Sequence, residues 1–305
     1  MPTTGPPGVV TFASICVSSC DGNPIDLVSS LSFAGLVAAG ALVAGLLGSL
    51  TGLGGGIVIV PMLTLLFHVD LRYAIGASLV SVIATSSGAA AAYVREGYTN
   101  VRVGIFLEVA TTIGALIGAA VAPRVATSAL AILFGVVLLQ SAYLSYKTRH
   151  DDEPLLVPDR WAGRLRLDSS YPTPTGRQPY AVQRVFGGFS VMFVAGVLSS
   201  LLGIGSGAVK VLAMDRMMRL PFKVSTTTSN FMIGVTAAAS AGVYLHRGYI
   251  EPVVAFPVLI GVLTGALTGA RLLTIASTRG LRLVFTAVVV ILAVEMLYKG
   301  ITGSL

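Results

Sequence analysis

Long apolar stretches alternate with short polar connections along most of the chain, and they fall into two sets of five. The first set is Phe33–Leu50, Ile57–Phe67, Tyr73–Val94, Val101–Pro123 and Ala126–Tyr146. The second set is Gly187–Leu202, Ala208–Leu220, Val224–Leu245, Pro252–Leu273 and Leu281–Tyr298. A helix needs roughly 20 apolar residues to cross the hydrocarbon of a bilayer. Three stretches of each set reach that length and the first is marginal, whereas the second is too short to cross alone.

A glycine-rich string precedes each short stretch, and the two strings stand at a constant offset of 151 positions. Gly45–Gly56 reads GLLGSLTGLGGG, and Gly196–Gly207 reads GVLSSLLGIGSG. The same offset relates Ser78 to Ser229 and continues over about 70 residues, which is the signature of an internal duplication. The pattern predicts an all-α fold in which one unit of about five helical segments is used twice.

Composition places this duplicated unit in a membrane. Hydrophobic residues make up 54% of the 305 residues, charged residues only 11%, and the mean hydropathy is +0.86. Soluble domains carry about 25% charged residues, so a polytopic membrane protein is predicted. The net charge of +7 is explained by basic cytoplasmic loops, and nucleic acid is excluded as a partner because no basic aromatic platform is present.

Four regions are expected from these patterns. Residues 1–30 form an extracytoplasmic lead-in, 31–147 the first transmembrane repeat, 148–184 a flexible hydrophilic linker, and 185–305 the second repeat. The linker is rich in proline and charge, with one amphipathic turn expected around Trp161. Cys16 and Cys20 lie in the lead-in, and the sequence leaves open whether they form a disulfide.

The positive charges predict the orientation of the chain. With the N-terminus outside and every stretch crossing, the inside receives fifteen basic residues: Arg95, Arg102, Lys147, Arg149, Arg160, Arg164, Arg166, Arg177, Arg184, Arg216, Arg219, Lys223, Arg271, Arg279 and Arg282. The outside receives Arg72, Arg124, Arg247 and Lys299. The positive-inside rule favours this arrangement, in which five crossings per copy give two repeats of inverted topology with a cytoplasmic linker. Re-entrant short stretches would instead give parallel repeats, which the charge distribution disfavours.

The glycine strings are the first candidate for a binding site. Helix N-termini present unpaired N–H groups and a partial positive charge, so two short helices meeting at the middle of the membrane could hold an anion. The candidate residues in the strings are Gly54, Gly55, Gly56, Gly205, Ser206 and Gly207. The alternative is that these glycines only permit close helix packing.

Two charged residues lie inside apolar stretches. A lysine at the centre of a membrane helix costs about 2.5–3.5 kcal/mol, so Lys210 is a candidate to bind an anion. Alternatively, it reaches the membrane surface or pairs with Asp215. Glu108 is the acidic counterpart. The sequence leaves open whether it pairs with Lys210, pairs with Arg102 or relays a proton.

Hydroxyl and amide groups complete the set of candidate ligands. Ser78, Ser229 and Asn230 lie on the duplicated stretch nearest the short helices, where they could coordinate the oxygens of a ligand. Serine also commonly bonds back to its own helix. The glycine strings lack the Lys-Ser/Thr of a phosphate loop, and Gly205-Ser206-Gly207 lacks the spacing of a membrane serine protease. The sequence therefore predicts a non-enzymatic protein without a metal or cofactor.

The duplicated pattern, from Gly52-Leu53-Gly54-Gly55-Gly56 to Pro61 with its counterpart Gly-Ile-Gly-Ser-Gly, resembles the sulfite exporter TauE/SafE family of membrane permeases. The resemblance implies export of sulfite, sulfoacetate or a related organosulfur anion across a bacterial inner membrane, in contact with membrane lipid. Family habit adds the expectation of a homodimer. Lys210 and Leu212 depart from the family pattern, which usually has hydrophobic and proline residues there.

Two other functions stay open at this point. One is proton-coupled uptake of a different small anion through Glu108. The other, from a different class, is a membrane enzyme or a sensor that transports nothing. Flux of labelled sulfite or sulfoacetate in vesicles separates a sulfur-oxyanion exporter from these alternatives, because neither of them moves the label.

Overall fold

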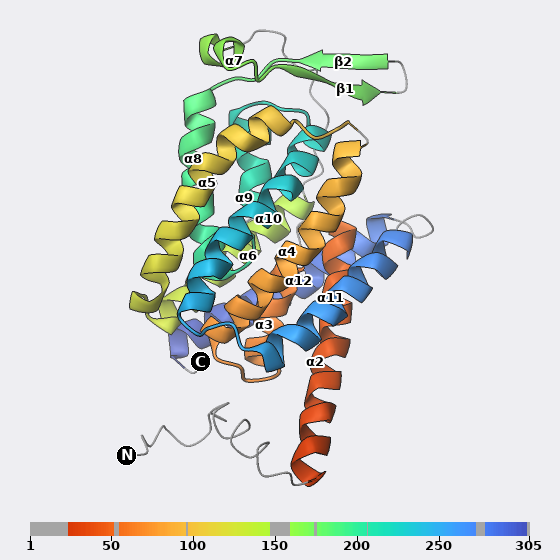
Figure 1. Cartoon of the computed structure of the whole chain (residues 1–305), viewed down its shortest axis with the longest axis vertical. Coiled ribbons are helices and arrows are strands. Elements are labelled where there is room, and N and C mark those ends of the chain that lie inside the picture. The colour runs from red at the N-terminus through yellow and green to blue at the C-terminus, as the bar shows by residue number, and fades with distance from the viewer. Residues whose placement is uncertain are drawn as a thin grey trace.

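The computed structural model describes residues 24–51, 55–95, 97–146, 159–173, 176–205, 207–272 and 278–303. These residues form an elongated helical bundle with a small folded cap at one end (Figure 1). The predicted all-α class is confirmed for the bundle. Gly54, Ser206, Cys16 and Cys20 lie outside the described residues.

The described residues of the first half form five helices and one 3-10 turn. They are α2 (Pro24–Thr51), α3 (Gly56–Leu65), α4 (Leu71–Arg95), α5 (Val101–Val121), η1 (Ala122–Arg124) and α6 (Thr127–Tyr146). Helix α2 begins nine residues before the predicted apolar stretch and extends beyond the bundle (Figure 1). Helix α3 has 10 residues, so at 1.5 Å per residue it spans only about half of the hydrocarbon thickness, as its sequence predicted.

The second half repeats this order. Its elements are α8 (Val185–Leu202), α9 (Gly207–Leu212), the π-helical turn η2 (Ala213–Met217), α10 (Phe222–His246), α11 (Pro252–Leu272) and α12 (Thr278–Thr302). Both ends of α10 and both ends of α11 lie 151 positions after the corresponding ends of α4 and α5. The duplication read from the glycine strings therefore extends to the helix boundaries.

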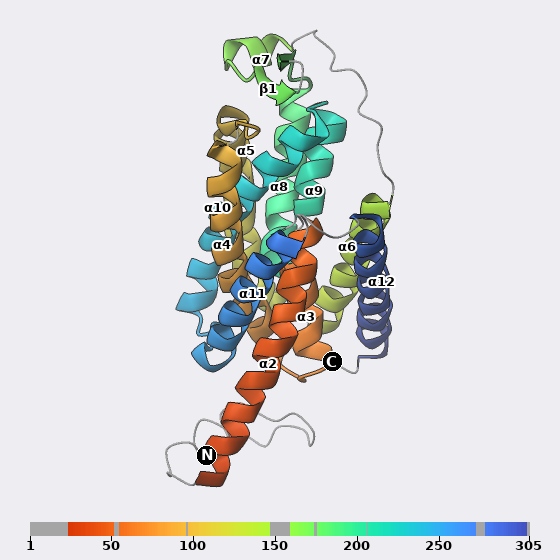
Figure 2. The same ribbon diagram turned by 90° about the vertical axis from the view of Figure 1, so that its right-hand side faces the viewer.

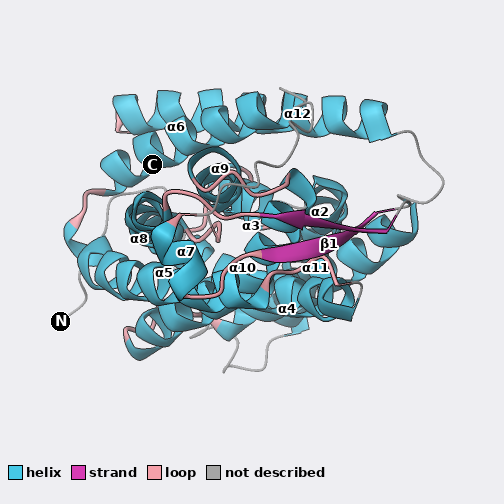
Figure 3. Cartoon of the chain, turned by 90° about the horizontal axis from the view of Figure 1, so that it is seen from above, coloured by secondary structure: helices cyan, strands magenta, loops and turns pink. Residues whose placement is uncertain are grey.

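Helices of the first half pack against helices of the second half. Helix α2 of the first half lies against α11 of the second, and α8 lies against α5 in the same way. A side chain at Gly45 would collide with the carbonyl of Val262, and one at Gly196 would collide with the carbonyl of Thr111. Thr111 and Val262 are themselves 151 positions apart, so the two crossings are equivalent. Helices α6 and α12 pair as a separate layer at one edge (Figure 3).

The linker contains ordered structure that hydropathy did not predict. The expected turn around Trp161 is helix α7 (Arg160–Arg164), and the antiparallel strands β1 (Ser169–Thr173) and β2 (Gly176–Tyr180) follow it. Figure 2 shows this cap above the ends of α5 and α8. The amide of Asn100, at the start of α5, donates to Leu167 O at 2.9 Å and to the Tyr180 hydroxyl at 2.8 Å. The described part of the linker is thus fastened to the bundle.

The outer surface of the bundle is apolar. Ile105, Val109, Ile113 and Leu116 form an exposed stripe along α5. By length and composition, Val101–Arg124 and Val185–Leu202 are each able to cross a membrane, and shorter apolar helical stretches occur in four other helices of the described chain. Apolar side chains that face outward along helices of this length fit a lipid environment.

Basic residues gather at both ends of the bundle. At the cap end, a guanidinium nitrogen of Arg102 donates to Arg166 O at 3.2 Å. At the opposite end, Arg72 donates to Pro123 O at 3.3 Å and Arg247 donates to Ala119 O at 3.1 Å. The residues predicted to face opposite sides of the membrane are therefore at opposite ends of α5.

Candidate functional site

The two glycine strings meet inside the bundle. Helix α3 begins at Gly56, and a Cβ there would lie 3.0 Å from the carbonyl oxygen of Gly203. Gly203 ends α8 in the left-handed region at φ 67°, where glycine avoids the strain of a side chain. Helix α9 starts four residues later, after Gly205 at φ 68°. The break in the second copy is therefore packed against the start of the short helix of the first.

Two predicted hydroxyl ligands hold these strings in place. Ser78 on α4 donates to Gly203 O at 2.8 Å, which links one repeat to the other. Its repeat counterpart, Ser229 on α10, donates to Gly207 O at 3.4 Å within its own repeat. Because each hydroxyl has a single proton, neither serine is free to donate to an anion in this conformation. Asn230 is buried beside Ser229 on the same helix.

A chain of polar side chains crosses the core next to the second string. The ammonium of Lys210 on α9 donates to the Thr236 hydroxyl on α10 at 2.5 Å. That hydroxyl lies 2.7 Å from Oε1 of Glu108 on α5. Lys210 and Thr236 are fully buried, and Glu108 is 8% exposed. Three helices thus bring an ammonium, a hydroxyl and a carboxylate together within the apolar core, and we call this the Lys–Thr–Glu chain.

The second carboxylate oxygen of Glu108 marks unused hydrogen-bonding capacity. Oε1 accepts from Thr112 at 3.1 Å as well as from Thr236, whereas Oε2 is buried without a hydrogen-bond partner. The hydroxyls of Ser199 and Ser200 on α8 are likewise buried and without partners. Buried polar groups are normally paired, so these three atoms are exceptions within the described core and could each accept or donate one further hydrogen bond.

The sequence predicted Lys210 and Glu108, the two ends of the Lys–Thr–Glu chain, as candidate site residues, but not Thr236 between them. It left the partner of Glu108 open between Lys210 and Arg102. The structure joins Glu108 to Lys210 through Thr236, while Arg102 bonds to the cap. The sequence did not distinguish Thr236, because threonine in a helix usually bonds to its own backbone, and the Thr236 hydroxyl also lies 2.9 Å from Met232 O, an alternative acceptor for its single proton. Lys210 does not reach the surface, contrary to one alternative, because its helix is enclosed by the bundle.

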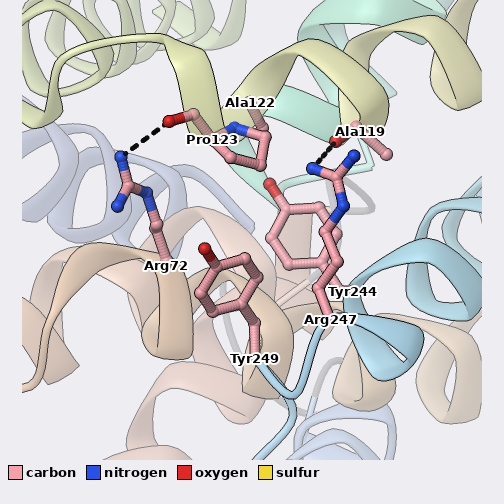
Figure 4. Close-up of a pocket in the computed structure, with 7 residues that line it drawn as sticks. All are labelled: Arg72, Ala119, Ala122, Pro123, Tyr244, Arg247 and Tyr249. Atoms are coloured by element: carbon pink, nitrogen blue, oxygen red, sulfur yellow. Dashed lines mark hydrogen bonds between the residues drawn. The ribbon is translucent and has the colours of Figure 1, made fainter.

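A second polar cluster lies at the end of the bundle opposite the cap. Arg72, Arg247, Tyr244 and Tyr249 line a shallow hollow with Ala122 and Pro123 (Figure 4). The Arg247 guanidinium donates to Ala119 O near the end of α5, the Arg72 guanidinium donates to Pro123 O in η1, and the Tyr244 hydroxyl donates to Ser200 O at 3.0 Å. Cations at a helix C-terminus stabilise its carbonyls, so this cluster caps α5.

A bundle of apolar helices, with broken helices and a buried ammonium–carboxylate chain at its core, is the architecture of a multi-pass membrane transporter. The comparison with known families agrees. The sequence profile described as "Sulfite exporter TauE/SafE" matches residues 37–296. The chain belongs to the TauE/SafE family, as the resemblance in its glycine motifs implied, and it is a transporter rather than an enzyme.

Curated relatives are named as probable membrane transporter proteins. The chain is 29% identical to the probable membrane transporter protein YunE of Bacillus subtilis over 279 residues, which are 89% of this chain and 99% of that protein. It is 27% identical to YdhB of the same organism, over 72% of this chain and 82% of that protein. A probable membrane transporter protein of Methanocaldococcus jannaschii is 24% identical over 84% and 92% of the two chains. No solved structure matches significantly.

Proposed function

We propose that this protein exports a small organosulfur oxyanion, such as sulfite, sulfoacetate or a related sulfonate, across the bacterial inner membrane. The family description supplies the substrate class. The proposal depends on the fully buried Lys210. Its ammonium donates to one neutral hydroxyl, that of Thr236, and this hydroxyl in turn bonds to the Glu108 carboxylate. An ammonium in a membrane core needs a compensating negative charge, and a transported anion can supply it.

Glu108 supplies that charge when no substrate is bound. Its carboxylate occupies the position beside Thr236 that an oxyanion would take. An anion that reaches Lys210 therefore competes with Glu108 for the Thr236 hydroxyl. Protonation of Glu108 would remove the competition, and this favours proton coupling as a second candidate mechanism, including proton-coupled uptake.

The topology we propose has two inverted repeats, with the N-terminus outside and the linker in the cytoplasm. Three observations support it: helices α2 and α8 start from opposite ends of the bundle (Figure 1), the crossings at Gly45 and Gly196 are equivalent, and the basic residues divide between the two ends of α5. In this arrangement the starts of α3 and α9, at Gly55, Gly56 and Gly207, face the middle of the membrane. Gly54, Gly205, Ser206, Ser78, Ser229 and Asn230 complete the proposed surroundings of the anion.

Export needs no ATP under this proposal. At a membrane potential of 100 mV, negative inside, a monovalent anion leaving the cell gains about 2.3 kcal/mol, close to a 50-fold gradient. A divalent anion gains about twice as much. The potential alone can therefore drive sulfite or a sulfonate outward.

Flux of labelled sulfite and sulfoacetate in reconstituted vesicles tests the function. Wild-type protein should move the label faster when the compartment that holds it is made negative. Lys210→Gln should abolish this flux, while Lys223→Gln, which removes an exposed lysine at the end of α10, should leave it unchanged. Absence of flux with every sulfur oxyanion, in protein that is folded, would disprove the export of this substrate class.

A further inference from the structure

Arginines surround the only tryptophan of the chain at the cap end of the bundle. Trp161 on α7 packs edge-on against Phe186 at 5.2 Å between ring centroids, and the Arg164 guanidinium lies 5.8 Å from the Trp161 ring centre. Arg102 is joined to this region through its bond to Arg166 O. The exposed arginines of this surface, here called the arginine collar, are Arg102, Arg160, Arg164, Arg166 and Arg184.

The arginine collar stands directly above two stripes of exposed apolar side chains. On α8, Phe186 and Val194 are exposed on one face, two turns apart. On α5, which packs against α8, Arg102 is followed on the same face by the exposed Ile105 and Val109. These stripes face lipid in a multi-pass protein, so the collar and Trp161 stand at the level where the hydrocarbon ends. Tryptophan is enriched at that level in membrane proteins.

The two carboxylates in the described part of the cap bond to backbone amides. Asp159 accepts from the backbone amides of Trp161 at 3.4 Å and Val185 at 3.3 Å. Asp168 accepts from the amide of Val182 at 2.8 Å. Asp159 thus links the start of α7 to α8, Asp168 holds the linker together, and the five exposed arginines of the collar outnumber these two acids.

We propose that the arginine collar binds the phosphate groups of anionic phospholipids, with Trp161 and Phe186 seated between the headgroups and the hydrocarbon. Guanidinium groups form paired, charge-assisted hydrogen bonds with phosphate oxygens. Each basic residue near an anionic membrane surface adds about fivefold to the affinity. Bound lipid would hold the cap against the bundle, and this role is independent of which anion is transported.

Trp161 makes the proposal measurable, because its fluorescence is the only tryptophan signal of the protein. Full-length protein is placed in nanodiscs of phosphatidylcholine with increasing phosphatidylglycerol. We expect the Trp161 emission to move to shorter wavelength and its quenching by acrylamide to fall as phosphatidylglycerol is added. Arg164→Gln should raise the phosphatidylglycerol fraction at half effect by roughly fivefold, and Arg160→Gln with Arg164→Gln and Arg166→Gln together should remove the response.

Arg177→Gln provides the matched control. Arg177 is an exposed arginine of the same cap, but it lies on β2 next to the hairpin turn, away from α7 (Figure 1). Its loss should leave the lipid response unchanged. Equal Trp161 emission in both lipids would overturn the proposal, as would an equal effect of Arg177→Gln. A matching response to millimolar inorganic phosphate in pure phosphatidylcholine would assign the collar to a soluble anion instead of lipid.

Discussion

The two repeats share a backbone and differ in their chemistry. Lys210, Thr236 and Glu108 in the Lys–Thr–Glu chain correspond, 151 positions apart, to Ile59, Thr85 and Leu259. Ile59 is fully buried, and the Thr85 hydroxyl bonds only to carbonyls of its own helix, at Ser81 and Val82. The duplication therefore built a symmetric scaffold, and one charged residue from each copy, Glu108 and Lys210, placed charge on one side of it.

The comparison of the two repeats separates residues that determine the fold from residues that determine the function. Positions shared by both copies, such as Gly45 and Gly196, are places where the backbones touch. Positions that differ include Lys210, and its fully buried apolar counterpart Ile59 shows that the equivalent place in the scaffold is filled without a charge. Variants that make the copies alike, or that damage both equally, test this division.

The largest effect is expected from removing one end of the Lys–Thr–Glu chain. Lys210→Met leaves the buried Glu108 without a compensating cation, which should lower the free energy of unfolding by about 3–5 kcal/mol. The double variant Lys210→Met with Glu108→Leu makes both positions apolar, like their counterparts Ile59 and Leu259, so it should recover most of that loss. Melting in detergent measures both. Transport should be absent in each.

The double variant is the decisive half of this experiment. If it were as unstable as Lys210→Met alone, the two charges would not be coupled through Thr236. If it were stable and still transported sulfite, the chain would be structural and the substrate would bind elsewhere.

The sequence predicted most of the scaffold and only part of the site. Most helix boundaries followed from the lengths of the apolar stretches and from the 151-position offset between the repeats. Both are read directly from the sequence. The strands β1 and β2 escaped prediction because five-residue strands containing proline and glycine carry no apolar period. The link from Lys210 to Glu108 was one of two pairings that the sequence left open, because it joins residues far apart in the chain and only the packing of α5, α9 and α10 decides which polar groups meet.

An intermediate effect is expected where the backbones of the two halves touch. Gly45→Leu and Gly196→Leu each force a side chain into a carbonyl of the facing helix, so each should cost about 1–3 kcal/mol or more of stability. The losses should be similar in size, because the crossings are equivalent. Melting temperature and yield of folded protein measure them.

Gly242→Ala on α10 is the control for these glycine variants. A Cβ there would meet nothing within 4 Å, so alanine should be neutral or should stabilise the helix by up to about 1 kcal/mol. A large loss at Gly196 alone, with Gly45→Leu tolerated, would mean that the two crossings are not equivalent and would weaken the symmetric scaffold.

The smallest effect is expected at the two equivalent serines, Ser78 and Ser229. Their variants test whether these hydroxyls stabilise the glycine strings or bind the transported anion. Ser78→Ala removes the 2.8 Å bond to Gly203 O between the repeats and leaves that carbonyl without this donor, which should cost about 1 kcal/mol. Ser229→Ala removes only a 3.4 Å bond within one repeat and should cost less. If both serines instead coordinate the anion, both variants should raise KM for sulfite while the melting temperature stays unchanged. A stability loss confined to Ser78→Ala, with unchanged KM in both, would assign the serines to the scaffold and leave Lys210 as the residue that sets anion affinity.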